Sequence, residues 1–204
     1  MNIPLKLISN QRRIGLTGGI ASGKSTITDY IKTNKKIPIL DADNLSRELI
    51  KPNTIVYKKI LDNFGNQIID KDSSEKQINR KFLKKIIFKD EKNREWINKL
   101  LHPLIREKMI NKCNQYKDNK VILLVVPLLF EANFEDLCTE IWLVKCTEEQ
   151  QIKRLVKRDK ISKQDACSII KLQMNFEAKA ILSDVILDNS DKTKQWINKI
   201  KELI

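Results

Sequence analysis

The sequence predicts an α/β protein in which helices flank a five-stranded parallel sheet. Short apolar segments alternate with longer stretches of helical periodicity, which is typical of β-α-β units. The segment at 121–126 is apolar without interruption, as expected of a strand that is covered on both faces. Four of the five glycines fall between Gly15 and Gly23, directly after the first apolar segment. The five predicted strands are residues 13–17, 37–41, 121–126, 141–146 and 185–187.

The first strand leads into a phosphate-binding loop, because residues 18–25 read GGIASGKS and fit the pattern G-x-x-x-x-G-K-[ST]. Glycines let successive N–H groups turn around an anion, and the helix predicted at 24–32 adds its N-terminal partial charge. Lys24 is expected to reach the β- and γ-phosphates, and the Ser25 hydroxyl to ligate Mg²⁺. Strand, loop and helix occur in order, which disfavours a chance glycine turn. The predicted nucleotide-binding residues are Gly18, Gly19, Ile20, Ala21, Ser22, Gly23, Lys24, Ser25 and Thr26.

The second strand ends in two carboxylates, Asp41 and Asp43. At the carboxyl end of a parallel strand they can face the triphosphate, where one could hold Mg²⁺ through water and the other accept a hydroxyl proton. The alternative is that Asp43 caps a helix at 44–49 while Asp41 is a structural hydrogen-bond acceptor.

A long helical stretch at about 52–117 separates the second and third strands and is large enough to wall off a second substrate. Ile60, Leu61 and Phe64 form one apolar helical face, and Gly65 ends that helix. Pro103 is expected to break a later helix and leave His102, the only histidine, at the joint. A lone histidine is more often structural than catalytic.

The third strand is followed by VPLLFE at 126–131, without the aspartate of a motor ATPase at this point. This favours a small-molecule kinase, in which Glu131 could orient a substrate or merely cap a short helix. After the fourth strand, Thr147 and Gln150 form a capping-box pattern, and the helix they open carries Arg154 and Arg158 one turn apart. These guanidinium groups suit phosphate oxygens, and the alternative is a solvated basic face.

Composition excludes several classes of protein. One histidine and no C-x-x-C pair make a His/Cys metal site improbable, and the four cysteines read as buried thiols of a reducing compartment. Residues 1–8 lack a secretory leader, and the longest apolar run is too short to span a bilayer, so a cytoplasmic location without membrane association is expected. The net charge of +13 comes with no nucleic-acid motif, and we expect no nucleic-acid partner.

Taken in order along the chain, these motifs resemble those of the dephospho-CoA kinase family. The segments that carry the resemblance are residues 14–26, 41–43, 101–103, 126–131, 154–159 and 188–189. The resemblance implies that ATP phosphorylates the ribose 3′-hydroxyl of dephospho-CoA, with Mg²⁺, to give CoA and ADP. The alternatives are another P-loop small-molecule or nucleotide kinase, and a regulatory or nucleic-acid-binding switch protein.

The resemblance also implies the architecture of a P-loop NTPase with a nucleoside-monophosphate-kinase-like core. That core comprises about 1–50, 118–146 and 174–204, with a helical substrate-binding insertion at about 51–117 and a lid at about 147–173. By position, Asp41 is the base, and Lys24 and Arg154 act on the transferring phosphoryl group, with Arg158 assisting. Asn189 lies near the adenine of ATP. The implied dephospho-CoA pocket contains Asp41, Asp43, Arg47, His102, Pro103, Pro127, Leu128 and Glu131.

The chain departs from the family pattern at a few positions. Ser190 and Asp191 stand where a glycine is usual after Asp188-Asn189. Phe176 stands where a basic residue often precedes the glutamate, which leaves the phosphate contacts of that segment to Lys179.

Overall fold

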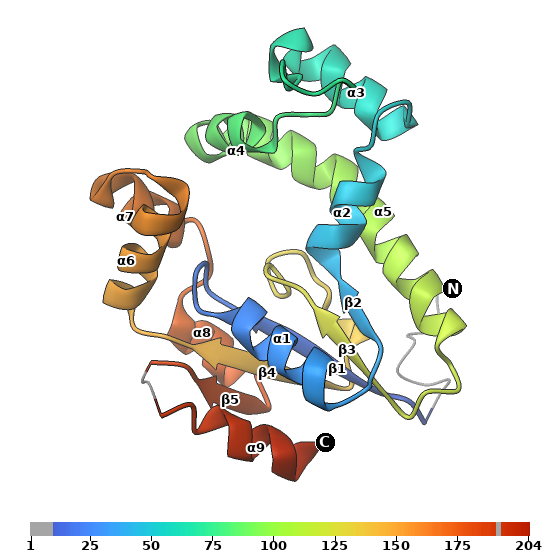
Figure 1. Ribbon diagram of the computed structural model, residues 1–204, viewed down its shortest axis with the longest axis vertical. Coiled ribbons are helices and arrows are strands. Elements are labelled where there is room, and N and C mark those ends of the chain that lie inside the picture. Colours follow the sequence, from blue (N-terminus) through green and yellow to red (C-terminus); the bar gives the residue numbers. More distant parts are fainter. Residues whose placement is uncertain (1–9, 191–192) are drawn as a thin grey trace. The chain divides into compact units, whose positions relative to one another are not determined.

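A computed structural model describes residues 10–190 and 193–204. The leader prediction for residues 1–8 and the departure at Asp191 therefore lie outside the described residues. All five predicted strands are present, and their bounds agree with the prediction to within two residues. They form one parallel sheet in the order β2-β3-β1-β4-β5 (Figure 1). The elements are β1 (Arg12–Gly18), α1 (Lys24–Asn34), β2 (Ile39–Asp41), α2 (Ala42–Leu49), α3 (Ile55–Phe64), η2 (Asn66–Ile68), α4 (Arg80–Lys89), α5 (Glu91–Gln115), β3 (Val121–Val125), η3 (Glu135–Leu137), β4 (Glu140–Lys145), α6 (Glu148–Asp159), α7 (Lys163–Lys171), α8 (Phe176–Ile181), β5 (Val185–Asp188) and α9 (Trp196–Leu203).

The chain divides into two compact units. Unit 1 comprises Met1–Asp41 and Lys112–Ile204, and it contains the sheet together with α1 and α6 to α9. Unit 2, Ala42–Asn111, is helical. The division has a simple cause, because the helices between β2 and β3 pack around a hydrophobic core of their own.

One face of the sheet in unit 1 is covered by α1 and α9. Ile14 and Leu16 of β1 are fully buried there, because alternate residues of a strand point to the same face. The remaining buried members of this core are Ile27, Ile31, Leu123, Val125, Trp142, Val144, Leu187, Trp196 and Ile200. At about 25 cal/mol per Å² of apolar surface removed from water, such burial is the main force that holds β1 in place.

Gly15 points to the opposite face of β1, where the segment after β3 packs closely. A Cβ at Gly15 would lie 2.5 Å from Cys138 Sγ and 2.8 Å from Leu129 Cδ1. Space, rather than backbone conformation, therefore requires glycine here. Cys138 and Cys113 are buried as predicted, and burial raises the pKa of the Cys113 thiol to about 11. Cys146 and Cys167 are only half-buried, so the prediction of burial is wrong for these two.

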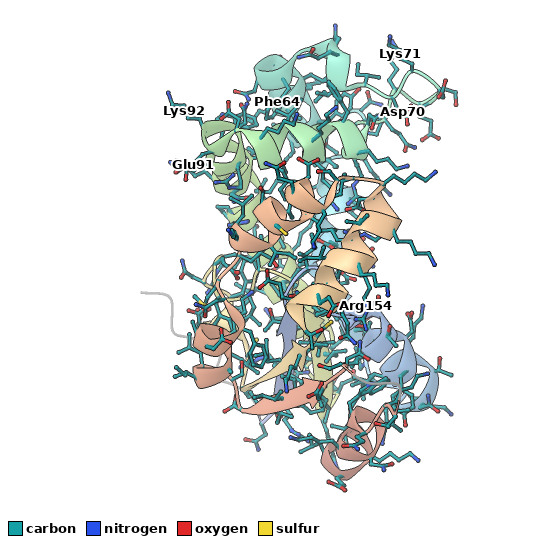
Figure 2. All side chains as sticks on the ribbon, turned by 90° about the vertical axis from the view of Figure 1, so that its left-hand side faces the viewer. Phe64, Asp70, Lys71, Glu91, Lys92 and Arg154 are labelled. Atoms are coloured by element: carbon teal, nitrogen blue, oxygen red, sulfur yellow. The ribbon has the colours of Figure 1, made fainter. Side chains whose placement is uncertain are left out.

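Unit 2 is built around α3, α4 and α5. The predicted apolar face of α3 is confirmed, with Ile60 and Phe64 buried and Gly65 (φ 75°) ending the helix. The ring of Phe64 meets Trp96 of α5 edge to face, with centroids 5.5 Å apart. Glu48 of α2 pairs with Lys108 of α5 at 3.7 Å. Figure 2 labels Phe64 in this unit.

The prediction that Pro103 breaks a helix is wrong. Helix α5 runs without interruption through His102 and Pro103. Proline lacks the N–H that would bond to the carbonyl four residues earlier, so the helix forgoes one hydrogen bond at Lys99. Buried residues on both sides, Ile97 and Ile105 among them, stabilise the helix across this gap. Along residues 10–190 and 193–204, no helix combines the length and apolar character of a membrane span.

Candidate active site

The loop between β1 and α1 adopts the backbone conformation that its glycines permit. Gly18 (φ 151°) and Gly23 (φ 102°) lie in the region that favours glycine, and Ala21 (φ 58°) is left-handed. A Cβ at Gly23 would also lie 2.0 Å from Asn189 Nδ2. Among the described residues, no side chain caps the first turn of α1. Its N-terminal N–H groups and partial positive charge are therefore available to an anion.

Lys24 lies over this loop. Its Nζ donates hydrogen bonds to the carbonyls of Gly18, at 2.6 Å, and Gly19, at 3.0 Å. Ser25 and Thr26 follow in the first turn of α1 with exposed side chains. The ammonium group and the Ser25 hydroxyl thus sit at the same end of α1, where sequence reasoning expected them.

Arg154 and Asn189 reach the loop from two other elements of unit 1. Arg154 of α6, labelled in Figure 2, donates to the carbonyls of Ala21 (3.3 Å) and Ser22 (3.1 Å) and to the carbonyl of Asn189 (3.3 Å). Asn189, which is buried directly after β5, donates from Nδ2 to the Ser22 carbonyl at 2.9 Å. Arg154 and Asn189 therefore both hold the Ser22 carbonyl and fix the backbone of the loop at this point.

Two glutamines that sequence reasoning missed also contact the loop. Gln151 of α6 donates from Nε2 to the carbonyl of Ile20 at 2.8 Å. Gln173, which follows α7, accepts from the Ile20 N–H at 2.7 Å. Their contacts with Ile20 span more than 100 residues of sequence, so no local periodicity could have predicted them.

Arg158 forms an ion pair with the next residue in the chain. It forms a bidentate ion pair with Asp159, at 2.7 and 2.8 Å, and both side chains are partly exposed. The capping box of Thr147 and Gln150 that opens α6 is present as predicted.

Asp41 ends β2 at the same edge of the sheet as the phosphate loop. It pairs with Val125 of β3, and Val125 pairs with Leu16 of β1. Because neighbouring strands lie about 4.8 Å apart, Asp41 is about 10 Å from β1 at this level. The loop starts two residues beyond Leu16, at Gly18. A carboxylate and a phosphate-binding loop therefore share one edge.

The turn after β3 carries Pro127, Leu128 and Glu131. The Pro127 carbonyl accepts from Thr17 Oγ1 at 3.3 Å, which ties the turn to β1. Glu131 Oε1 lies 2.8 Å from Lys179 Nζ and accepts from the Met174 N–H at 3.0 Å. The Lys179 side chain is only 1% exposed. It is held in a buried ion pair, unlike the phosphate-contacting lysine expected from the sequence.

In unit 2, Asp43 and Arg47 lie on α2 and Arg80 begins α4. Burial and the nearby Arg47 guanidinium lower the pKa of Arg80, while the Asp43 carboxylate raises it, so these three groups lie within electrostatic range. Sequence reasoning missed Arg80, because it sits among the lysines of a basic helix. Burial lowers the pKa of His102 on α5, and Pro103 beside it is exposed.

A phosphate loop between β1 and α1, on a parallel sheet ordered β2-β3-β1-β4-β5, defines a P-loop kinase. The chain belongs to the dephospho-CoA kinase family, whose model matches residues 12–195. It is 67% identical to the dephospho-CoA kinase of Prochlorococcus marinus strain MIT 9312 and 62% identical to that of Prochlorococcus marinus subsp. pastoris, and each match covers both chains completely. A solved dephospho-CoA kinase from Campylobacter jejuni is 25% identical, with a TM-score of 0.65 over 96% of this chain and 98% of its own.

Proposed function

We propose that this protein transfers the γ-phosphoryl group of ATP to the ribose 3′-hydroxyl of dephospho-CoA. The products are CoA and ADP, and the reaction is the last step of CoA biosynthesis. The observation that carries this proposal is the 67% identity, over the full length of both chains, with a dephospho-CoA kinase. The phosphate loop supports it, because such loops hold the β- and γ-phosphates of a nucleotide.

The ATP site comprises the loop residues Gly18 to Thr26, together with Arg158 and Asn189. Lys24 is already positioned above the loop by two carbonyl oxygens, which supports a role at the β- and γ-phosphates. Within the described residues, no cluster of three or more His, Cys, Asp or Glu side chains could hold a metal ion by itself. The exposed Ser25 hydroxyl fits Mg²⁺ that arrives with the nucleotide. The bound ion would neutralise phosphate charge during transfer.

Catalysis rests mainly on positioning and charge in this scheme. Asp41 accepts the proton of the 3′-hydroxyl and aligns its oxygen with the phosphoryl group. Arg154 stabilises the negative charge that develops on the transferring oxygens, and its contacts with the loop carbonyls support this location. Residues 147–173 form a lid whose closure excludes water, so that ATP is not wasted by hydrolysis.

The acceptor pocket is assigned to the end of β2, α2, the helical insertion at about 51–117 and the turn after β3. We propose that its residues are Asp41, Asp43, Arg47, His102, Pro103, Pro127, Leu128 and Glu131. Arg80 joins this set, because a second guanidinium held near Arg47 suits the diphosphate of the acceptor. A cytoplasmic location is part of the proposal and agrees with cysteines that are present as free thiols.

The test is mass spectrometry of the products after the protein is mixed with Mg·ATP and dephospho-CoA. Adenosine 5′-phosphate and shikimate serve as parallel acceptors, and the Lys24→Ala variant is the control. CoA that forms only with active protein and dephospho-CoA supports the assignment. Transfer to another acceptor, without CoA, would retain the P-loop chemistry and overturn the substrate.

A further inference from the structure

One residue of the phosphate loop, Ile20, is held from both sides by the side chains of two glutamines. The Ile20 N–H donates to Gln173 Oε1 at 2.7 Å, and the Ile20 carbonyl accepts from Gln151 Nε2 at 2.8 Å. We propose that Gln151 and Gln173 are positioning residues that brace the phosphate loop in its nucleotide-binding conformation. This inference goes beyond the proposed function, although it rests on the loop binding ATP.

The two glutamines lie at opposite ends of the pair of helices formed by α6 and α7. Gln151 is in the first turn of α6, and Gln173 comes two residues after the end of α7. The proposed lid thus joins the rest of unit 1 at two points, and at each of them one side chain contacts Ile20. The orientation of Ile20 is therefore tied to both ends of the lid.

The backbone beside Gln173 is anchored independently of the loop. The next residue, Met174, donates its N–H to Glu131 Oε1 at 3.0 Å, and the same oxygen lies 2.8 Å from Lys179 Nζ. The Lys179 side chain is 1% exposed and the Glu131 side chain 20% exposed, so this ion pair is largely removed from water. A fixed backbone limits the positions that the Gln173 side chain can take, and a brace requires such rigidity.

Gly19 gives separate evidence that Gln151 belongs to the loop structure. In the pattern G-x-x-x-x-G-K-[ST], the second position is variable, yet this chain has glycine there. Gly19 is absent from the residues with positive φ, so its backbone does not demand glycine. A Cβ at Gly19 would instead lie 2.2 Å from Gln151 Nε2. The missing side chain makes room for the brace.

The two hydrogen bonds fall on the two peptide groups that flank the Ile20 Cα, so together they limit the rotation of both groups. A loop that is ordered before the nucleotide arrives loses less conformational entropy on binding, so affinity rises. The brace acts before the chemical step, in the binding of ATP, and should leave the phosphoryl-transfer rate unchanged.

The first test replaces each glutamine with methionine, which has similar size but neither donates nor accepts a strong hydrogen bond. Gln151→Met and Gln173→Met should each raise the KM for ATP about fivefold, with kcat and the KM for dephospho-CoA within twofold of wild type. Equilibrium binding of a non-hydrolysable Mg·ATP analogue should weaken by the same factor. Gln164→Met, at an exposed position on α7, is the matched control and should change nothing. Unchanged or tighter nucleotide binding in both glutamine variants would overturn the proposal.

The second test uses glutamate, which can accept a hydrogen bond but cannot donate one when ionised. Gln173→Glu keeps the acceptor for the Ile20 N–H, whereas Gln151→Glu sets a carboxylate against the Ile20 carbonyl. Both variants add the same charge near Ile20, so the difference between them reports the hydrogen bond. Nucleotide binding should be several-fold tighter in Gln173→Glu than in Gln151→Glu, and equal binding would overturn the brace. Because binding is measured without an acceptor, failure of the wild-type protein to form CoA would count only against the proposed substrate.

Discussion

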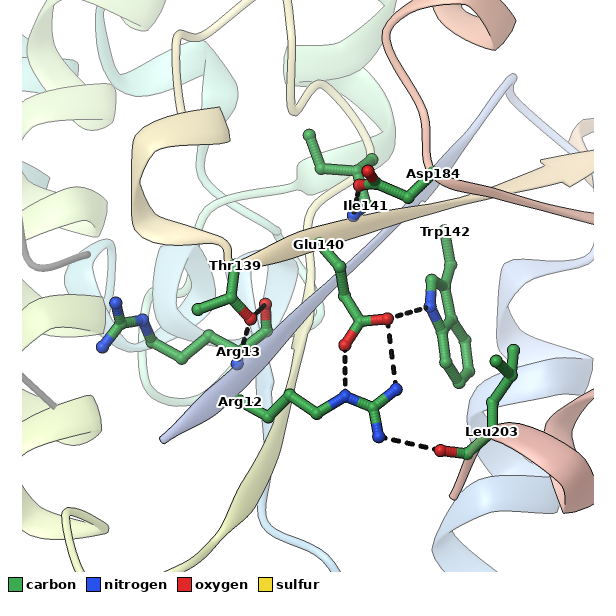
Figure 3. Close-up of polar contacts among 8 residues, drawn as sticks. All are labelled: Arg12, Arg13, Thr139, Glu140, Ile141, Trp142, Asp184 and Leu203. Atoms are coloured by element: carbon green, nitrogen blue, oxygen red, sulfur yellow. Dashed lines mark hydrogen bonds and ion pairs between the residues drawn. The ribbon is translucent and has the colours of Figure 1, made fainter. Parts of the chain in front are cut away.

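Polar side chains at the two ends of β1 contact different kinds of partner. At the amino end, Arg12 forms a two-pronged ion pair with Glu140 of β4 and donates to the Leu203 carbonyl of α9 (Figure 3). Glu140 also accepts from Trp142 Nε1 at 3.0 Å. The ion pair and these hydrogen bonds join β1, β4 and α9.

At the carboxyl end, side chains are matched with the backbone. Lys24, Gln151, Arg154 and Asn189 all donate to carbonyls of the phosphate loop. Such contacts fix the shape of the loop, and Gln173 adds one more by accepting from the Ile20 N–H. The comparison teaches that polar contacts at the amino end of the strand tie neighbouring elements together, whereas those at the carboxyl end shape the phosphate loop. Substitutions at the two ends should therefore have different kinds of effect.

The largest effect is expected from Lys24→Ala at the carboxyl end. Loss of the ammonium group should lower kcat/KM by about 10³-fold, because a preorganised charge at the β- and γ-phosphates is removed. The midpoint of thermal unfolding should stay within a few degrees of wild type, since Lys24 is not part of the core. A coupled assay for ADP release and a thermal melt check both expectations. A variant that is inactive because it is unfolded would break the comparison.

Asp41→Asn should lower kcat by about 10²-fold, because the amide cannot accept the hydroxyl proton. Binding of an ATP analogue should be unchanged, since Asp41 lies on β2, two strands away from the loop. Single-turnover kinetics with saturating ATP separate the chemical step from binding. Near-wild-type turnover would contradict the assignment of the base.

Gly19→Ala should weaken ATP binding about fivefold, because the new methyl group displaces the Gln151 side chain from the Ile20 carbonyl. The double variant with Gln151→Met should be no weaker than either single variant, since both remove one contact. Additive losses, measured by equilibrium binding of the analogue, would show that the alanine acts through something other than Gln151.

Arg12→Met at the amino end should lower the free energy of unfolding by about 1 kcal/mol, because the pair with Glu140 is only partly buried. Both kcat and the KM for ATP should stay within twofold of wild type. Urea denaturation measures the first quantity and the kinase assay the second. A loss of activity larger than the loss of folded protein would break the separation between the two ends.

The smallest effect concerns Asp188, at the carboxyl end of β5. Burial raises the pKa of Asp188, but the hydrogen bonds from Ser190 and Lys145 lower it by a larger amount. The pKa therefore lies below its ordinary value of 3.8. The unfolded chain therefore takes up this proton more readily, and the stabilisation, present above pH 3.8, is lost as pH falls through the folded pKa. As pH falls, the free energy of unfolding should decrease by a few tenths of a kcal/mol less in Asp188→Asn than in the wild type. An unchanged pH dependence would mean that the Lys145 pair contributes nothing.

Much of the fold could be predicted from the sequence, because the strands are short apolar runs between helical stretches. Residues 121–126 are apolar throughout, and β3 was correspondingly easy to find. Pro103 misled the prediction, since the rule that proline ends a helix considers only the local backbone. Burial of Ile97 and Ile105 in α5 outweighs that local penalty.

The candidate site was predictable where a motif concentrates chemistry in consecutive residues. Gly18 to Ser25 revealed the loop, and the order of the later motifs indicated Asp41 and Arg154. Gln151 and Gln173 could not be found in this way, because a single glutamine carries no periodicity and its contact with Ile20 depends on the folded chain. Lys179 was wrongly expected to contact phosphate. The sequence shows only that the residue is positively charged, whereas in the structure its buried ammonium group pairs with Glu131.

The strand order has a consequence for biosynthesis of the chain. The central strand β1 is made first, yet Arg12 pairs with Val121 and Ile14 with Glu140, residues that leave the ribosome much later. At synthesis rates of about 5–20 residues per second, β1 waits on the order of ten seconds for its neighbours. The sequence of the helical unit, Ala42–Asn111, is complete before β3 is translated. The segment that carries the phosphate loop therefore precedes both of the strands that pair with it, and it stays unpaired until β3 has been made.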